Sequence, residues 1–131
     1  ELSLTNLHYL FVQVNTSLDT LLASLPTQTL HFVTIQFPDP WFKKRHAKRR
    51  IVQPELVDTL AEYLQSGGQV FLQSDVQFVI EEMIRHFMVH SAFSREIPFW
   101  LPENPLPVAT EREKSTLQQN EPVYRTLFRK T

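Results

Sequence analysis

Residues 30–50 read LHFVTIQFPDPWFKKRHAKRR and combine a strand-forming run, two prolines and a basic cluster. Residues 30–37 are rich in aromatic, aliphatic and β-branched side chains, which is typical of a strand buried on both faces. Both Phe37 and Asp39 precede a proline, and this restricts their backbones to extended conformations. The chain is therefore expected to leave the strand along a stiff path, with the Asp39 carboxylate fixed close to the end of the strand.

Strands and helices alternate on either side of this segment. The spacing of apolar residues predicts strands at residues 7–14, 30–37, 69–73 and 123–129, and helices at residues 17–25, 54–65 and 76–87. Pro54 suits the first position of its helix, and Gly67-Gly68 would end it. Residues 98–107 hold four prolines and should form a loop, followed by one or two helical turns at residues 110–119. This order predicts an α/β domain with a mostly parallel sheet and an antiparallel edge strand.

Sheets of this kind bind ligands beyond the carboxyl ends of their strands, which directs attention to the residues after Val14, Phe37 and Gln73. Directly after Phe37, the Asp39 carboxylate could accept hydrogen bonds from a nucleic-acid base while the indole of Trp41 stacks on it. The alternative is an ordinary Pro-Asp-Pro turn whose Trp41 packs on the core.

The positive charge of the chain is concentrated in one place. Six of its 13 basic residues lie within residues 43–50, where no acidic residue occurs, while the rest of the chain carries 7 basic and 14 acidic residues. Such a cluster favours a local site for a polyanion, because lysine and arginine neutralise phosphates without reading sequence. A solvated face and a nuclear localisation signal are the alternatives, although the latter usually lies in a flexible tail.

Composition excludes several other classes of function. The 131 residues are 42% hydrophobic and 21% charged, which is typical of one globular domain or part of one. The absence of cysteine excludes disulfides, cysteine-ligated zinc and thiol nucleophiles. His86 and His90 stand four residues apart without a third ligand, so no metal site is expected. No apolar run approaches the length of a membrane span, and no signal peptide is recognisable.

The segment FPDPWFKKRHAKRRIVQP, residues 37–54, resembles the signature of bacterial tRNA (guanine-N7)-methyltransferases. Ser74-Asp75, the Thr-x-x-Glu pattern of residues 110–113 and the terminal strand of residues 123–130 are similar to further parts of that family. The resemblance implies a Rossmann-like, class I S-adenosylmethionine-dependent methyltransferase. Members of the family begin with a strand and a Gly-rich cofactor loop that this sequence lacks. Residues 1–131 are therefore expected to be a partial methyltransferase domain, the C-terminal portion of its parent enzyme and inactive alone.

The same resemblance assigns Asp39 to catalysis and to the cofactor pocket, and Asn15 to the adenine of the cofactor. Together with the residue chemistry above, it predicts tRNA contacts by twelve residues: Trp41, Lys43, Lys44, Arg45, Lys48, Arg49, Arg50, Asp75, Thr110, Glu111, Arg112 and Glu113. Local structure offers alternative explanations for Asn15, Asp75, Thr110 and Glu113. Asn15 suits a plain turn, Ser74-Asp75 suits the start of a helix, and Thr110 with Glu113 matches a capping box.

The resulting functional prediction is transfer of a methyl group from S-adenosylmethionine to N7 of a guanine in the tRNA variable loop, by a cytoplasmic parent enzyme without metal or membrane. The rival prediction is a non-enzymatic RNA-binding module that uses the basic residues 43–50. The absence of the first strands of the sheet also predicts an exposed apolar edge and a tendency to self-associate.

Overall fold

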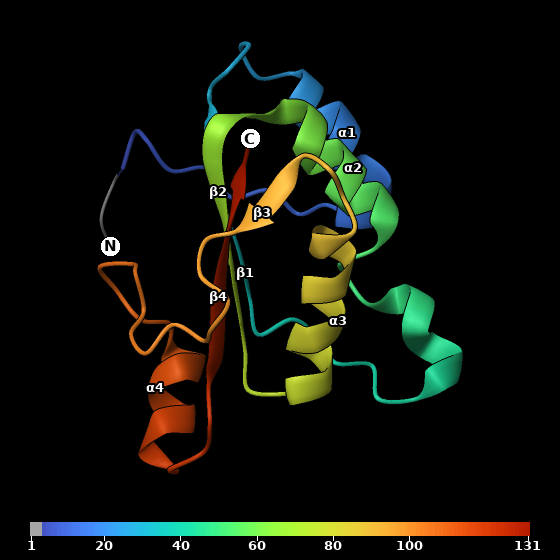
Figure 1. Cartoon of the computed structure of the whole chain (residues 1–131). Coiled ribbons are helices and arrows are strands. Elements are labelled where there is room, and N and C mark those ends of the chain that lie inside the picture. The colour runs from blue at the N-terminus through green and yellow to red at the C-terminus, as the bar shows by residue number, and fades with distance from the viewer. Residues whose placement is uncertain (1–3) are drawn as a thin grey trace.

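A four-stranded sheet carries α1 (Val14–Ala23), α2 (Pro54–Tyr63) and α3 (Gln77–Met88) on one face, while α4 (Glu111–Gln118) lies apart from them beside the sheet (Figure 1). The computed structural model describes residues 4–131. In chain order, the elements are α1 (Val14–Ala23), β1 (Leu30–Gln36), the short 3-10 helix η1 (Lys44–Arg49), α2 (Pro54–Tyr63), β2 (Leu64–Ser74), α3 (Gln77–Met88), β3 (Phe93–Arg95), α4 (Glu111–Gln118) and β4 (Tyr124–Lys130).

The order of strands in the sheet is β1-β2-β4-β3. Strands β1 and β2 are parallel, whereas β4 is antiparallel to both of its neighbours. Three strands thus run in one direction and β4 runs against them, which confirms the predicted α/β class with a largely parallel sheet. The antiparallel strand lies inside the sheet instead of at its edge, because the unpredicted strand Phe93–Arg95 pairs with its outer side.

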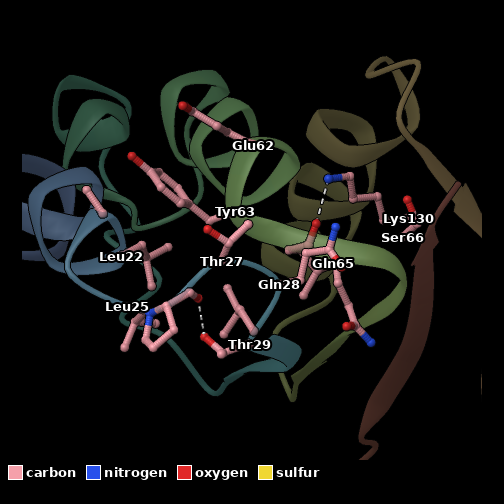
Figure 2. A pocket seen from close by; sticks show the side chains of 14 residues that line it. Leu22, Leu25, Thr27, Gln28, Thr29, Glu62, Tyr63, Gln65, Ser66 and Lys130 are labelled. Carbon is pink, nitrogen blue, oxygen red and sulfur yellow. Dashed lines mark hydrogen bonds between the residues drawn. The ribbon is translucent and has the colours of Figure 1, made fainter.

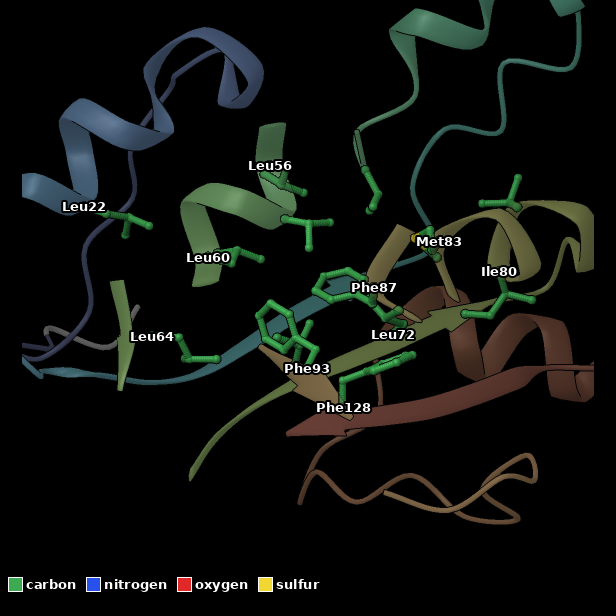
Figure 3. Packing of buried hydrophobic residues seen from close by; sticks show 14 residues of the cluster. Leu22, Leu56, Leu60, Leu64, Leu72, Ile80, Met83, Phe87, Phe93 and Phe128 are labelled. Carbon is green, nitrogen blue, oxygen red and sulfur yellow. The ribbon is translucent and has the colours of Figure 1, made fainter. Parts of the chain in front are cut away.

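The apolar core lies between the sheet and α1, α2 and α3 (Figure 3). The ring of Phe87 on α3 lies 5.1 Å from that of Phe93 and 5.3 Å from that of Phe128. From α2, Leu56 and Leu60 enter the same core. Burial of this apolar stripe explains why the helices predicted at residues 54–65 and 76–87 are confirmed to within two residues.

The strand predicted at residues 7–14 is wrong. Residues 7–13 form no regular element, and Val14 already begins α1. A strand needs a neighbour to take up its backbone hydrogen bonds, and in the described part of the chain β1 pairs only with β2. Residues 7–12, called the apolar segment below, consequently stay exposed, with Tyr9 at 90% of its full exposure.

The expectation that residues 30–37 are buried on both faces is also wrong. His31, Phe32 and Thr34 are exposed, because β1 is an edge strand whose second face is uncovered by the described residues. The predicted self-association through such an edge stays a prediction.

Strand β2 begins earlier than expected, since α2 ends at Tyr63 and Leu64 is already extended. Gly67 and Gly68 therefore lie in the strand and do not terminate the helix. Gly67 has a φ of +83°, in the left-handed region that glycine adopts without strain. A Cβ added to Gly68 would stand 2.7 Å from Cγ of Leu64, so the close approach at this position requires glycine.

Candidate active site and nucleic-acid interface

The segments that follow β1 and β2 meet at one edge of the sheet. Gln36 and Gln73 are register partners at the ends of two parallel strands, so Asp39 and Asp75 both lie beyond the same carboxyl edge. Helix α4 is tied to this edge, because Nη2 of Arg112 donates to Oδ2 of Asp75 at 2.7 Å. The structure thus brings Asp75 and the segment of residues 110–113 together.

Asp39 lies in a tight and strained turn. Its Oδ1 accepts a hydrogen bond from the backbone N–H of Trp41 at 3.0 Å. Trp41 has a φ of +44° and Phe37 a φ of +49°, both in the left-handed region. Such conformations cost about 1–3 kcal/mol each and cluster at functional sites, where surrounding contacts hold them in place.

The expectation that Phe37 is extended before its proline is wrong. The backbone N–H of Phe37 donates to the carbonyl of Gln73 at 2.7 Å, which continues the β1–β2 ladder by one residue. The guanidinium of Arg112 lies 5.9 Å from the centre of the Phe37 ring. These two contacts offset the local preference set by Pro38.

Most of the basic cluster faces solvent. Lys43, Lys44, Arg45, Lys48 and Arg49 are exposed, and η1 carries the last four of them on a segment that projects from the body of the molecule beyond α3 (Figure 1). The guanidinium of Arg49 lies 5.1 Å from the centre of the Trp41 ring, and His46 meets the same ring edge-on at 5.6 Å. The cluster is therefore anchored to the turn that contains Asp39.

Arg50 differs from the other basic residues because its side chain turns inward. Its Nε donates to the carbonyl of Pro40 at 3.0 Å and its Nη2 to the carbonyl of Trp41 at 3.1 Å. Its Nη1 forms an ion pair of 2.6 Å with Oε2 of Glu82 on α3. Contact of Arg50 with a tRNA phosphate stays a prediction, but the guanidinium already has a protein partner at each nitrogen.

Ser74 takes the local role that the sequence allowed for Ser74-Asp75, while contact of Asp75 with tRNA stays a prediction. The Ser74 hydroxyl accepts from the backbone N–H of Val76 at 3.0 Å and stabilises the turn into α3. The Asp75 carboxylate is 11% exposed and its Arg112 partner 60%. The hydrogen bond from Arg112 to Asp75, together with the charge of that carboxylate, raises the pKa of the Arg112 guanidinium above its ordinary value.

Only half of the predicted capping box forms. The Thr110 hydroxyl accepts from the backbone N–H of Glu113 at 3.1 Å, as expected of a cap at the start of α4. The Glu113 carboxylate is buried instead and accepts from Nδ2 of Asn104 at 2.9 Å and from Arg125 at 3.4 Å. Of residues 110–113, Glu111 and Arg112 are therefore the exposed pair, while Glu113 belongs to the interior.

Asn15 does not follow a strand, as the sequence suggested, but lies in the first turn of α1. It lines two cavities of about 70 and 380 Å³, the first with Asp19 and Glu55 and the second with Lys48 and Gln53. Asp39 lines neither of them. Contact of Asn15 with the adenine of a cofactor stays a prediction.

A larger cavity lies at the other end of the sheet. It measures about 410 Å³ and is lined by the loop before β1 and the start of β2, with Thr29, Tyr63 and Lys130 on its walls (Figure 2). The Nζ of Lys130 is held by the carbonyl of Leu64 at 2.5 Å. Because this cavity adjoins the amino end of β1 and Asp39 follows its carboxyl end, the cavity is separate from the candidate site.

Next to Asp39 the space is small. A cavity of about 10 Å³ is lined by Asp39, Arg50, Val79 and Glu82, among others.

Within residues 4–131, no group of three histidine, aspartate or glutamate side chains is placed to hold a metal ion, and no helix is long and apolar enough to cross a bilayer.

Sequence reasoning missed two sets of residues at this edge. One is Glu82 with Phe78 on α3, which lie outside the apolar stripe of the helix and contact Arg50. The other is a chain of side chains across the sheet, in which Gln73 donates to Gln36 at 2.9 Å and accepts from Arg125 at 2.8 Å. The only local signal was a polar Gln73 at the end of an apolar strand.

Comparison with known proteins agrees with the resemblance noted in the sequence. Residues 1–126 match the family Methyltransf_4, described as "Putative methyltransferase". Proteins named tRNA (guanine-N(7)-)-methyltransferase from Nostoc sp. PCC 7120, Synechococcus elongatus PCC 7942 and Microcystis aeruginosa NIES-843 are 61, 59 and 55% identical over 100, 98 and 98% of this chain.

The chain covers 60, 60 and 61% of those three relatives, so it spans about 60% of the length of the curated proteins it matches. The family match extends over residues 1–126 and includes the Asp39 turn, the basic cluster and α4. The mixed α/β sheet, with ligand-type residues at its carboxyl edge, fits a Rossmann-like methyltransferase. The chain therefore belongs to the Methyltransf_4 family of methyltransferases.

Proposed function

We propose that the full-length protein methylates N7 of a guanine in the variable loop of tRNA, and that residues 1–131 form a partial methyltransferase domain of that enzyme. The observation that carries the proposal is the position of one carboxylate, Asp39, at the carboxyl edge of the sheet beside five exposed basic residues. The names of the relatives at 55 to 61% identity support the choice of reaction.

The chemistry at N7 matches this small set of groups. Guanine N7 carries an in-plane lone pair and no proton, so no general base is needed to create the nucleophile. As the new N–CH₃ bond forms, positive charge grows on the imidazole ring of the base. A fixed carboxylate at Asp39 would stabilise that charge and help to orient the base.

S-adenosylmethionine, when bound, would supply the methyl group on an electrophilic sulfonium. The described residues suit one part of this donor, because the Asp39 carboxylate is exposed and would attract a cation. They do not enclose the rest of it, since the cavity beside Asp39 measures only about 10 Å³. We therefore place the remainder of the donor pocket outside residues 1–131, and expect this chain alone to bind the donor weakly.

The basic cluster is assigned to the phosphates of the tRNA. Lys43, Lys44, Arg45, Lys48 and Arg49 would neutralise backbone phosphates and supply affinity, while Trp41 and the Thr110–Glu113 segment would favour the target guanine. Asp75 and Arg112 lie at the same edge and would contact the substrate through the exposed Arg112. A tRNA substrate also implies a cytoplasmic site of action.

The decisive experiment uses the full-length gene product and a tRNA transcript whose target guanosine is replaced by 7-deazaguanosine. Loss of methylation on this analogue, which has a C–H group in place of N7, would support the proposed acceptor atom. Asp39→Asn keeps the size of the side chain and removes its charge, so kcat should fall by on the order of 10² with little change in tRNA affinity. Methylation of the deaza transcript would contradict the assignment.

One observation favours the rival function, an RNA-binding module without catalysis. Five of the six basic residues of the cluster are exposed, whereas the described residues do not enclose a site for a methyl donor beside Asp39. This rival requires the full-length gene product to bind tRNA and to leave every guanosine unmethylated. Incorporation of a labelled methyl group from S-adenosylmethionine would exclude it.

A further inference from the structure

An ion pair between Arg50 and Glu82, called the clamp below, connects α3 to the turn that contains Asp39. We infer that Glu82, acting through Arg50, is a positioning residue that orients the Asp39 carboxylate for methyl transfer. The inference rests on the proposed function for its catalytic readout, and on the geometry of residues 37–50 and α3 for its structural one.

Two backbone groups of Trp41, its N–H and its carbonyl, hold the turn. The backbone N–H of Trp41 donates to Oδ1 of Asp39 at 3.0 Å, and the carbonyl of Trp41 accepts from Nη2 of Arg50 at 3.1 Å. The carbonyl of Pro40, which belongs to the same peptide group as that N–H, accepts from Nε of Arg50 at 3.0 Å. Rotation of the peptide group between Pro40 and Trp41 would therefore change both the Asp39 contact and the Arg50 contact.

Arg50 can fix the turn only if its own guanidinium is fixed. Glu82 supplies that constraint through the ion pair of 2.6 Å, in which the Arg50 side chain is 13% exposed and the Glu82 side chain 21%. The Phe78 ring lies one helical turn before Glu82, with its centre 5.1 Å from the guanidinium carbon. A carboxylate at one nitrogen and an aromatic face together set the orientation of the guanidinium.

Glu82 is suited to this task because it is carried by a rigid element. Its neighbours Val79 and Met83 are each 3% exposed and belong to the core, so α3 cannot shift without disturbing core packing. The strained φ of +44° at Trp41 needs such support, because nothing in the sequence of the turn favours the left-handed region. The position of Asp39 is thus determined by α3, which follows it by about forty residues in the chain.

The clamp also gives Arg50 a different role from that of the exposed basic residues. With its three nitrogens engaged by Pro40, Trp41 and Glu82, Arg50 contributes to the geometry of the turn and not to phosphate affinity. A positioning role therefore predicts a change in kcat, whereas a phosphate contact predicts a change in tRNA affinity and in its salt dependence.

The experiment compares Glu82→Ala and Glu82→Gln with Glu81→Ala in the full-length gene product. Glu81 is the matched control, since it lies on the same helix, carries the same charge and bonds only to Gln77 among the described residues. Glu82→Ala should lower kcat about ten- to hundredfold at an unchanged KM for tRNA. Glu82→Gln keeps an acceptor for Arg50 and should retain more activity, and Glu81→Ala should behave as the wild type.

A second readout reports the turn directly. In protein labelled with 5-fluorotryptophan, the ¹⁹F resonance of Trp41, assigned by its loss in Trp41→Phe, should shift or broaden in Glu82→Ala and not in Glu81→Ala. An unchanged kcat, an unchanged Trp41 resonance, or a loss confined to KM and salt dependence would each overturn the inference. If Glu82→Ala does not fold, Glu82→Gln decides the same questions. A wild-type protein without methylation would refute the proposed function, while the Trp41 resonance would still test the clamp.

Discussion

Neutralising Lys44 and Arg45 together should weaken the salt dependence of tRNA binding, by an amount that follows from the number of exposed basic residues. Five residues of the basic cluster are exposed, and Arg50 is not among them. If all five contact phosphates, the logarithm of the affinity should fall with the logarithm of salt at a slope of roughly −4.5. The variant Lys44→Gln/Arg45→Gln leaves three contacts and a slope of roughly −2.7.

These slopes translate into large differences in affinity. Between 50 and 200 mM salt, the wild type should lose roughly 500-fold in affinity and the double variant roughly 40-fold. Fluorescence anisotropy with end-labelled tRNA and the full-length gene product, measured across that range, gives both slopes. Arg129→Gln is the control, because it removes one exposed cation at the opposite end of the sheet, where Arg129 pairs with Glu96.

Two results would refute the reasoning. A double variant with the wild-type slope would show that Lys44 and Arg45 form a solvated face without phosphate contacts. A slope that weakens equally in Arg129→Gln would show that the cations act through the total charge of the protein. The loss of affinity in the double variant should also be uniform across tRNA sequences, since phosphate contacts carry little sequence information.

Three further expectations concern stability and assembly. Glu113→Ala leaves the buried guanidinium of Arg125 without its carboxylate, so urea denaturation should show a free energy of unfolding lower by about 3–5 kcal/mol. Glu111→Ala, on the exposed side of the same helix, should lower it by less than about 1 kcal/mol. Gly68→Ala should cost about 1–3 kcal/mol in the same assay, because the new Cβ would meet the side chain of Leu64. The 131-residue chain should self-associate at high concentration through the uncovered edge strand β1 and the exposed apolar segment, and light scattering from a strict monomer would contradict this.

Local patterns in the sequence were sufficient for the helices that bury one apolar stripe. Leu56, Val57 and Leu60 recur at helical spacing after Pro54, so the sequence itself marks the face that the helix buries against the core. The same holds for the cap at Thr110, whose hydroxyl needs only the N–H three residues later. The position of the candidate site was also predictable, since Asp39 and the basic residues after it follow a strong strand signal and lie beyond the carboxyl end of β1 in the structure.

What the sequence could not determine depends on groups that are distant in the chain. Residues 7–12 have strand-forming side chains, yet they remain irregular because a strand exists only with a partner. The sequence suggested that Glu113 is half of a capping box, but in the structure its carboxylate is buried in an ion pair with Arg125 and a hydrogen bond from Asn104. Arg50 looked like its basic neighbours, but Glu82, 32 residues later, turns it inward. Local spacing specifies which backbone hydrogen bonds can form, whereas a charged side chain takes the partner that the folded chain brings within reach, and only the tertiary structure decides which one that is.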